Sequence, residues 1–146
     1  MLLHTSGKEL EATPIYEKLL KLDPNNPTAL NNLADILAVN PSTLERALDL
    51  AAKALNINPT DPNIADTLAT IHVKKHQPEQ AVAILNESIK NNPSLSYAPT
   101  FHLHLGQALQ LKGEKAAAKQ ALEKALTLEP IESDEKEIRA ALAKLN

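Results

Sequence analysis

The sequence contains no cysteine and no tryptophan, and only 2% of its 146 residues are aromatic. The absence of cysteine excludes disulfides, thiolate catalysis and cysteine-ligated zinc, although it leaves the compartment open between cytoplasm and periplasm. No apolar run approaches the roughly 20 residues of a membrane-spanning helix, and the opening Met1–His4 is too short for a signal peptide. The lack of a long apolar run argues against membrane insertion. Lysine and arginine form no cluster and the net charge is −3, which argues against a nucleic-acid partner.

Alanine and leucine are abundant, apolar residues make up 43% of the chain, and there are three glycines. This composition favours helices. With so few aromatic residues, the core has to be built from leucine, isoleucine, valine and alanine. The length suits one domain or one array of repeats.

Four prolines mark a repeat. Pro24, Pro59, Pro93 and Pro130 each follow a helical pattern, at successive spacings of 35, 34 and 37 residues. Between Pro59 and Pro93 two helical patterns meet at a turn. A period near 34 residues predicts stacked helix–turn–helix units.

Local signals predict where each helix begins. Capping boxes are expected at Ser6–Glu9 and Ser42–Glu45, and a helix start is expected after each of four caps or prolines, namely Asn26-Pro27, Asp61-Pro62, Gln77-Pro78 and Pro99. Gly113 is expected to form a turn, and the three-residue excess over the 34-residue unit falls within 94–99. The helix ending near Leu22 is predicted to present the apolar face Leu10, Ile15, Leu19 and Leu22, with Tyr16 beside it.

We therefore divide the single array into a partial repeat (1–26), three repeats (27–60, 61–94 and 95–131) and a capping helix (132–146). The capping helix carries Ile138, Ala141, Leu142 and Leu145 on one face and a polar outer face, which includes Asp134 and Glu137, as the end of an array requires. Since the first repeat lacks most of its first helix, we expect the chain to be a fragment of a longer protein.

The units resemble the tetratricopeptide repeat. The family's Leu-Gly-aromatic pattern of the first helix corresponds to Leu33-Ala34 with Leu37, Leu68-Ala69 with His72, and Leu105-Gly106 with Leu109. The family's second helix has an alanine, an aromatic residue, a second alanine and a closing proline. These positions correspond to Ala12, Tyr16, Leu19 and Pro24; Ala47, Ala51, Ala54 and Pro59; Ala81, Leu85, Ser88 and Pro93; and Ala118, Leu122, Ala125 and Pro130. The stretches 22–34 and 45–51 are also similar to bacterial tetratricopeptide proteins associated with exopolysaccharide and exosortase systems.

The resemblance implies an all-α, right-handed superhelical solenoid whose first helices line a concave surface. It also implies that this surface binds a peptide or a partner protein. The matching positions are Thr28, Asn31, Asp35, Asn63, Asp66, Thr70, Thr100, Leu103, His104 and Gln107, with Asn32 and Thr67 nearby. Asp35 and Asp66 make this surface acidic, which favours a basic or neutral extended peptide.

Other chemistries have less support from the sequence. The family's carboxylate clamp uses lysine and arginine to hold a C-terminal acid, and the corresponding positions lack basic residues. His72 and His76 are four residues apart, a metal-binding spacing on a helix, but His72 falls where the repeat packs an aromatic residue. We expect no cofactor and no enzymatic activity.

Two roles stay open. The first is a protein-binding scaffold that uses the concave face. The alternative is a structural spacer or self-association module, because a missing first helix would leave the N-terminal edge around Leu10 and Leu19 open to pair in a homodimer.

Overall fold

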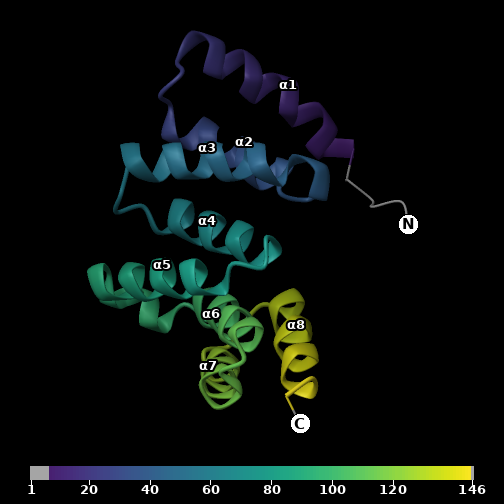
Figure 1. Ribbon diagram of the computed structural model, residues 1–146, viewed down its shortest axis with the longest axis vertical. Helices are drawn as coiled ribbons and strands as arrows, with labels where there is room; N and C mark the ends of the chain where they lie inside the picture. The colour runs from purple at the N-terminus through teal and green to yellow at the C-terminus, as the bar shows by residue number, and fades with distance from the viewer. Residues whose placement is uncertain (1–6, 146) are drawn as a thin grey trace. The chain divides into compact units, whose positions relative to one another are not determined.

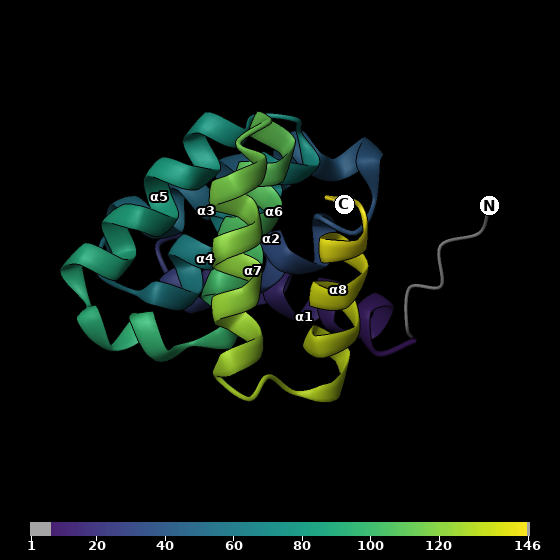
Figure 2. The same cartoon turned by 90° about the horizontal axis from the view of Figure 1, so that it is seen from below.

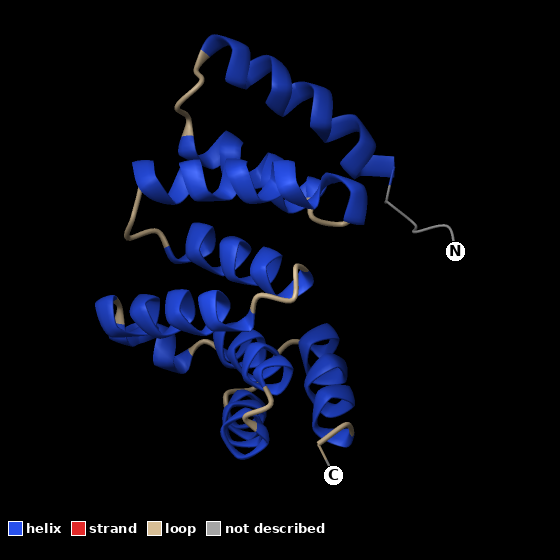
Figure 3. Cartoon of the chain, in the orientation of Figure 1, coloured by secondary structure: helices blue, strands red, loops and turns tan. Residues whose placement is uncertain are grey.

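The computed structural model describes residues 7–145, and the described residues are helical with no strand among them (Figure 3). The chain divides into two compact units, residues 1–75 and 76–146. Each unit is considered by itself. None of the described helices is long and apolar enough to cross a membrane.

Unit 1 holds four α-helices and a 3₁₀ turn, labelled in Figure 1: α1 (Gly7–Leu22), α2 (Pro27–Leu37), η1 (Pro41–Thr43), α3 (Leu44–Ile57) and α4 (Pro62–Lys74). Helix α2 packs against α1, α3 and α4, and α3 also packs against α4. Its core brings Leu30 of α2 together with Ala54 of α3 and Ile64 of α4, all at most 2% exposed. The alanine lets the three helices approach closely because its side chain is small.

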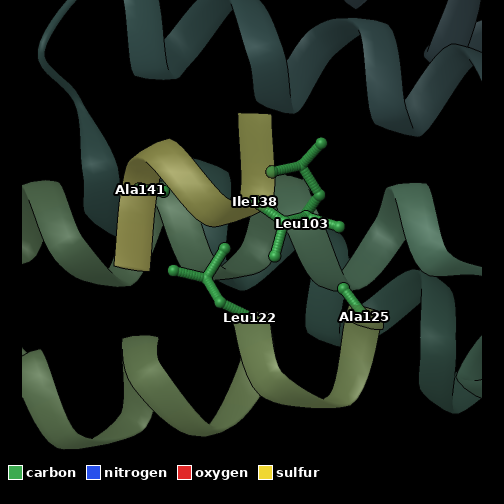
Figure 4. Packing of buried hydrophobic residues seen from close by; sticks show 5 residues of the cluster. All are labelled: Leu103, Leu122, Ala125, Ile138 and Ala141. Atoms are coloured by element: carbon green, nitrogen blue, oxygen red, sulfur yellow. The ribbon is translucent and has the colours of Figure 1, made fainter. Parts of the chain in front are cut away.

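Unit 2 holds α5 (Pro78–Asn91), η2 (Pro93–Tyr97), α6 (Pro99–Lys112), α7 (Lys115–Thr127) and α8 (Glu132–Ala143). Helix α6 packs against α5, α7 and α8, and α7 also packs against α8. Figure 2 shows α7 and α8 side by side. Figure 4 shows the core that they share with α6, in which Leu103, Leu122 and Ile138 converge with two alanines.

The predicted helix starts hold at most positions. Asn26 caps α2 by accepting a hydrogen bond from the Ala29 N–H at 2.9 Å, and Asp61 caps α4 by accepting from the Asn63 N–H at 2.9 Å. The helices α2, α4, α5 and α6 begin at prolines, where no intrahelical hydrogen bond is lost. The extra residues after Pro93 form the 3₁₀ helix η2.

Of two expected capping boxes in unit 1, one is not formed and the other is not tested. Ser42 does not cap α3, because Asn40 accepts from the Ser42 N–H at 3.0 Å and starts the 3₁₀ turn η1 instead. The capping box at Ser6–Glu9 lies outside the described residues and side chains, as does the side chain of Leu10.

The apolar face predicted for α1 is also wrong in part. Ile15 is 65% exposed and Leu22 is 79% exposed. The half-buried Leu20 packs against the core of unit 1 instead, and the Tyr16 hydroxyl accepts a hydrogen bond from Asn32 Nδ2 at 3.1 Å. Helix α1 therefore meets α2 through residues one position further along than the predicted stripe.

Two glycines of unit 2 serve different purposes. Gly113 adopts φ +88° and ends α6 in the left-handed conformation that glycine tolerates best. Gly106 lies where α6 crosses α7, and a Cβ atom built on it would lie 2.6 Å from Leu122 Cγ. The absence of a side chain at Gly106 permits this close approach of the two helices.

Beside Gly113, the hydrogen bond from Lys112 to the Glu114 carboxylate raises the pKa of that lysine.

Candidate functional site

The predicted partner-binding residues of unit 1 lie on two adjacent helices, α2 and α4. We name this set the first-helix face; it consists of Thr28, Asn31 and Asp35 of α2 with Asn63, Asp66 and Thr70 of α4. Within each helix the residues are spaced three or four apart and so share one side of it. Thr28, Asp35 and Asn63 are exposed, and Asp66 and Thr70 are half-buried.

Asn31 differs from its neighbours on the first-helix face. Its side chain is only 9% exposed, and its Oδ1 is buried without a hydrogen-bond partner in the described part of the chain. Leaving a buried acceptor unsatisfied costs about 1–3 kcal/mol. The next residue, Asn32, is turned toward α1 and bonded to Tyr16, so the two neighbouring amides have different roles.

The corresponding residues of unit 2 lie on α6, and two of them are already bonded to the C-terminal helix. Thr100 Oγ1 donates to Asp134 Oδ2 at 2.8 Å, and Gln107 Nε2 donates to Glu137 Oε2 at 3.4 Å. Helix α8 therefore covers part of the α6 face that the sequence assigned to a partner. His104, between these two residues, is half-buried.

Leu103 does not lie on a surface that a partner can reach. Its side chain is 1% exposed and packs in the core with Leu122 and Ile138 (Figure 4). Helix α8 places Ile138 directly over this part of α6. A terminal helix that caps the array has buried a position that the family pattern assigns to the ligand surface.

The sequence interpretation placed Asp134 and Glu137 on the outer face of the capping helix and missed their hydrogen bonds to α6; Asp134 is half-buried and Glu137 is exposed. A signal was present, because Asp134, Glu137, Ile138 and Ala141 follow the spacing i, i+3, i+4 and i+7 of one helix face. The remaining charges of α8 do face solvent, where Lys136 pairs with Glu132 and Arg139 pairs with Glu135.

The histidine pair does not form the helical spacing considered from the sequence. Helix α4 ends at Lys74, and His76 adopts φ +57° in the turn that follows. The four-residue interval therefore does not place both imidazoles on one helix face. Among residues 7–145 no group of three or more histidine, aspartate or glutamate side chains is arranged to hold a metal ion.

Solved structures with the same fold support the repeat architecture. TTC0263, a thermophilic TPR protein from Thermus thermophilus, is 28% identical over 95% of this chain and 73% of its own, with a TM-score of 0.78. MamA from Desulfovibrio magneticus is 20% identical over 95% of this chain and 84% of its own, with a TM-score of 0.72. Another MamA crystal structure is 22% identical over 94% and 79% of the two chains, with a TM-score of 0.73.

Sequence comparison identifies the family directly. No curated protein matches the chain significantly. Two family models described as tetratricopeptide repeat do match, one over residues 15–48 and the other over residues 1–26 and 99–132. These segments make up more than half of the chain, and the described residues form the helix pairs that such repeats require. The chain belongs to the tetratricopeptide repeat family.

Proposed function

We propose that this chain is a protein-interaction scaffold that binds an extended, basic or neutral peptide segment of a partner on its first-helix face. Membership of the tetratricopeptide repeat family supports a scaffold role in general. The choice of face and the chemistry of the peptide rest on the side chains of α2 and α4.

The observation that carries the proposal is the buried amide oxygen Oδ1 of Asn31, which has no hydrogen-bond partner among the described residues. Asparagine offers both an acceptor and a donor, the two groups that an extended peptide backbone needs. We propose that this side chain turns on binding, so that its amide, between Thr28 and Asp35 on one side of α2, meets the peptide backbone. Binding would thereby satisfy a group whose burial otherwise costs stability.

The charge of the first-helix face supports a basic or neutral ligand. The face carries Asp35 and Asp66 and no lysine or arginine among its six residues. Carboxylates attract cationic side chains and repel the acidic ones. A peptide with lysine or arginine beside its backbone contact to Asn31 would therefore be preferred over an acidic one.

Unit 2 contributes less of the proposed binding surface. Thr100 and Gln107 already donate to α8, and Leu103 is in the core. His104 of α6 is half-buried, and its role in binding stays a prediction. We place the main contacts on unit 1 for this reason.

We also propose the division into repeats at 27–60, 61–94 and 95–131, between a partial repeat at 1–26 and the capping helix at 132–146. The helix bounds support it, because each repeat contains two α-helices. The similarity of residues 22–34 and 45–51 to proteins of exopolysaccharide and exosortase systems suggests a bacterial setting in which to seek the partner.

The test is fluorescence anisotropy with three matched peptide sets, basic, neutral and acidic, on the unmodified chain and on Asp35→Lys/Asp66→Lys. We expect the basic set to bind the unmodified chain best, and the double variant to reverse that preference. The control is Asp49→Lys, an exposed acid on α3 outside the face, which should leave the order of the three sets unchanged. The proposal would be contradicted if the unmodified chain, the double variant and Asp49→Lys all ranked the three peptide sets in the same order.

A further inference from the structure

A groove lies on unit 1 outside the first-helix face. It has a volume of about 350 Å³ and is lined by residues of α1, α2 and α3. Its apolar surface is formed by Leu20, Leu33 and Leu50, of which Leu33 is 0% exposed and the other two are half-buried. We name it the leucine groove. Its leucine walls suit contact with a branched aliphatic side chain.

The rim of the leucine groove is cationic. Glu17, Lys21 and Arg46 form its charged part. Arg46 Nη2 donates to Glu17 Oε1 at 2.9 Å, so these two charges neutralise each other. Lys21 is exposed and has no ion-pair partner among residues 7–145. The rim therefore has one net positive charge, which favours an occupant with an acidic group beside its apolar side chain.

Such a combination occurs on unit 2 of the same chain, in the connection between α7 and α8. Ile131 is 69% exposed, and it lies between the exposed carboxylates Glu129 and Glu132. Glu132 is paired with Lys136 at 2.6 Å, whereas Glu129 has no partner in the described part of the chain. We name the segment 129–132 the acidic knob. It has one branched aliphatic side chain and two carboxylates, of which that of Glu132 is paired with Lys136 outside the segment.

We propose that the acidic knob of one copy inserts into the leucine groove of a second copy, with Ile131 against the three leucines and Glu129 beside Lys21. The match is in both shape and charge, since a branched aliphatic residue meets a leucine-lined groove and a lone anion meets a lone cation. We take the contact as head-to-tail, so that each copy keeps a free knob and a free groove. A head-to-tail contact leads to chains or rings, whereas two reciprocal contacts would close a pair.

Two other sites on the chain are weaker candidates for the same knob. A second groove of about 350 Å³ lies on unit 2 and is lined by Leu105, Leu109 and alanines of α7, with Lys124 as its lysine. Alanine walls leave an isoleucine fewer contacts than leucine walls do. The exposed stripe Ile15, Leu19 and Leu22 of α1 lines neither of these two grooves.

The size of the contact determines how strong the association is. One isoleucine and its flanking acids bury far less than the roughly 1,200 Å² at which stable interfaces begin. The association is therefore transient, and its extent rises with protein concentration. It is independent of peptide binding, because no residue of the first-helix face takes part.

The test is sedimentation velocity from about 10 µM to about 1 mM on the unmodified chain and on two single variants. Lys21→Glu disables the groove, and Ile131→Ser disables the knob. The average mass of the unmodified chain should rise with concentration beyond that of a dimer, and each variant should associate at least tenfold more weakly. The controls are Lys18→Glu, an exposed lysine of α1 outside the groove, and Lys124→Glu in the second groove; both should behave like the unmodified chain.

Mixing the two disabled variants gives the decisive result. Lys21→Glu retains an intact knob and Ile131→Ser retains an intact groove. Each alone should be monomeric, whereas the mixture should form a one-to-one dimer and stop there. A single chain that carries both Lys21→Glu and Glu129→Lys exchanges the two charges. It should again form species larger than a dimer.

Several results would overturn the proposal. One is that the unmodified chain stays a monomer at all concentrations. Another is that Lys124→Glu loses association while Lys21→Glu does not. A third is that the mixture of Lys21→Glu and Ile131→Ser forms no dimer. If Ile15→Ser abolished self-association while Lys21→Glu left it unchanged, the contact would lie on the α1 stripe instead. Peptide anisotropy on the same variants keeps the two proposals separate, because none of these changes touches the first-helix face.

Discussion

At the scale of single residues, Asn31 illustrates how stability and binding can conflict. Its amide oxygen is buried and unpartnered in unit 1, and leucine has nearly the same shape without the polar atoms. We expect Asn31→Leu to raise the free energy of unfolding by about 1 kcal/mol, because the cost of the unsatisfied acceptor disappears. Urea unfolding followed by circular dichroism measures this change.

The same substitution should weaken peptide binding, since the backbone contact is lost. Asn32→Leu is the matched control, because that amide is bonded to Tyr16, and it should lower stability instead. If Asn31→Leu lowers both stability and affinity, Asn31 has only a structural role.

Gly106 shows the opposite constraint, a position without room. In a helix interior, replacing glycine by alanine normally stabilises the helix by about 0.5–1 kcal/mol. In Gly106→Ala the new Cβ would lie 2.6 Å from Leu122 Cγ and 2.7 Å from Leu122 Cδ2, and Leu122 is fully buried. Overpacking costs about 1–3 kcal/mol, so we expect a net loss of about 1 kcal/mol by urea unfolding. In the background of Leu122→Ala the glycine substitution should become neutral or favourable, and an unchanged penalty would refute the steric explanation.

His76 occupies a turn that another repeat fills with glycine. It adopts φ +57°, and Gly113 adopts φ +88° at the corresponding turn of the next repeat. A side chain in this conformation costs roughly 1–2 kcal/mol. We expect His76→Gly to stabilise the chain by about 1 kcal/mol in thermal unfolding, and His76→Ala to give no such gain.

At the scale of helices, α8 acts as a cap and as part of the α6 surface. Ile138 is 0% exposed between Leu103 and Leu122. Ile138→Ala should cost about 2–5 kcal/mol through the lost contacts and the cavity, measured by urea unfolding. Ala140→Ser, on the exposed side of the same helix, should change stability by less than about 0.5 kcal/mol.

At the scale of the whole molecule, the two compact units predict a stability that is not uniform along the chain. In repeat arrays each element is stabilised mainly by its neighbours. We expect Leu30→Ala, in the core of unit 1, to reduce amide hydrogen-exchange protection in α2 to α4 more than in α7 and α8. Leu122→Ala should show the reverse pattern, and equal loss in all helices would mean that the chain unfolds as one cooperative block.

The amino-acid sequence was sufficient to predict the helices and the family. Prolines at a period near 34 residues, the caps Asn26 and Asp61, and Gly113 act through local backbone chemistry, so their effects can be read without knowing the neighbours. The family resemblance assigned Thr28, Asn31 and Asp35 to a partner-binding surface, and helical spacing places the three on one side of α2. That this side binds a partner stays a prediction.

Side-chain burial and pairing depended on which helices meet. Leu103 became a core residue because α8 carries Ile138 over it, and Thr100 and Gln107 found acidic partners on that helix 30 or more positions away. The exposed stripe of α1 arose because Leu20, rather than Leu19, faces the core of unit 1. Local spacing gives the direction of a side chain relative to its own helix, whereas only packing in three dimensions decides what lies there.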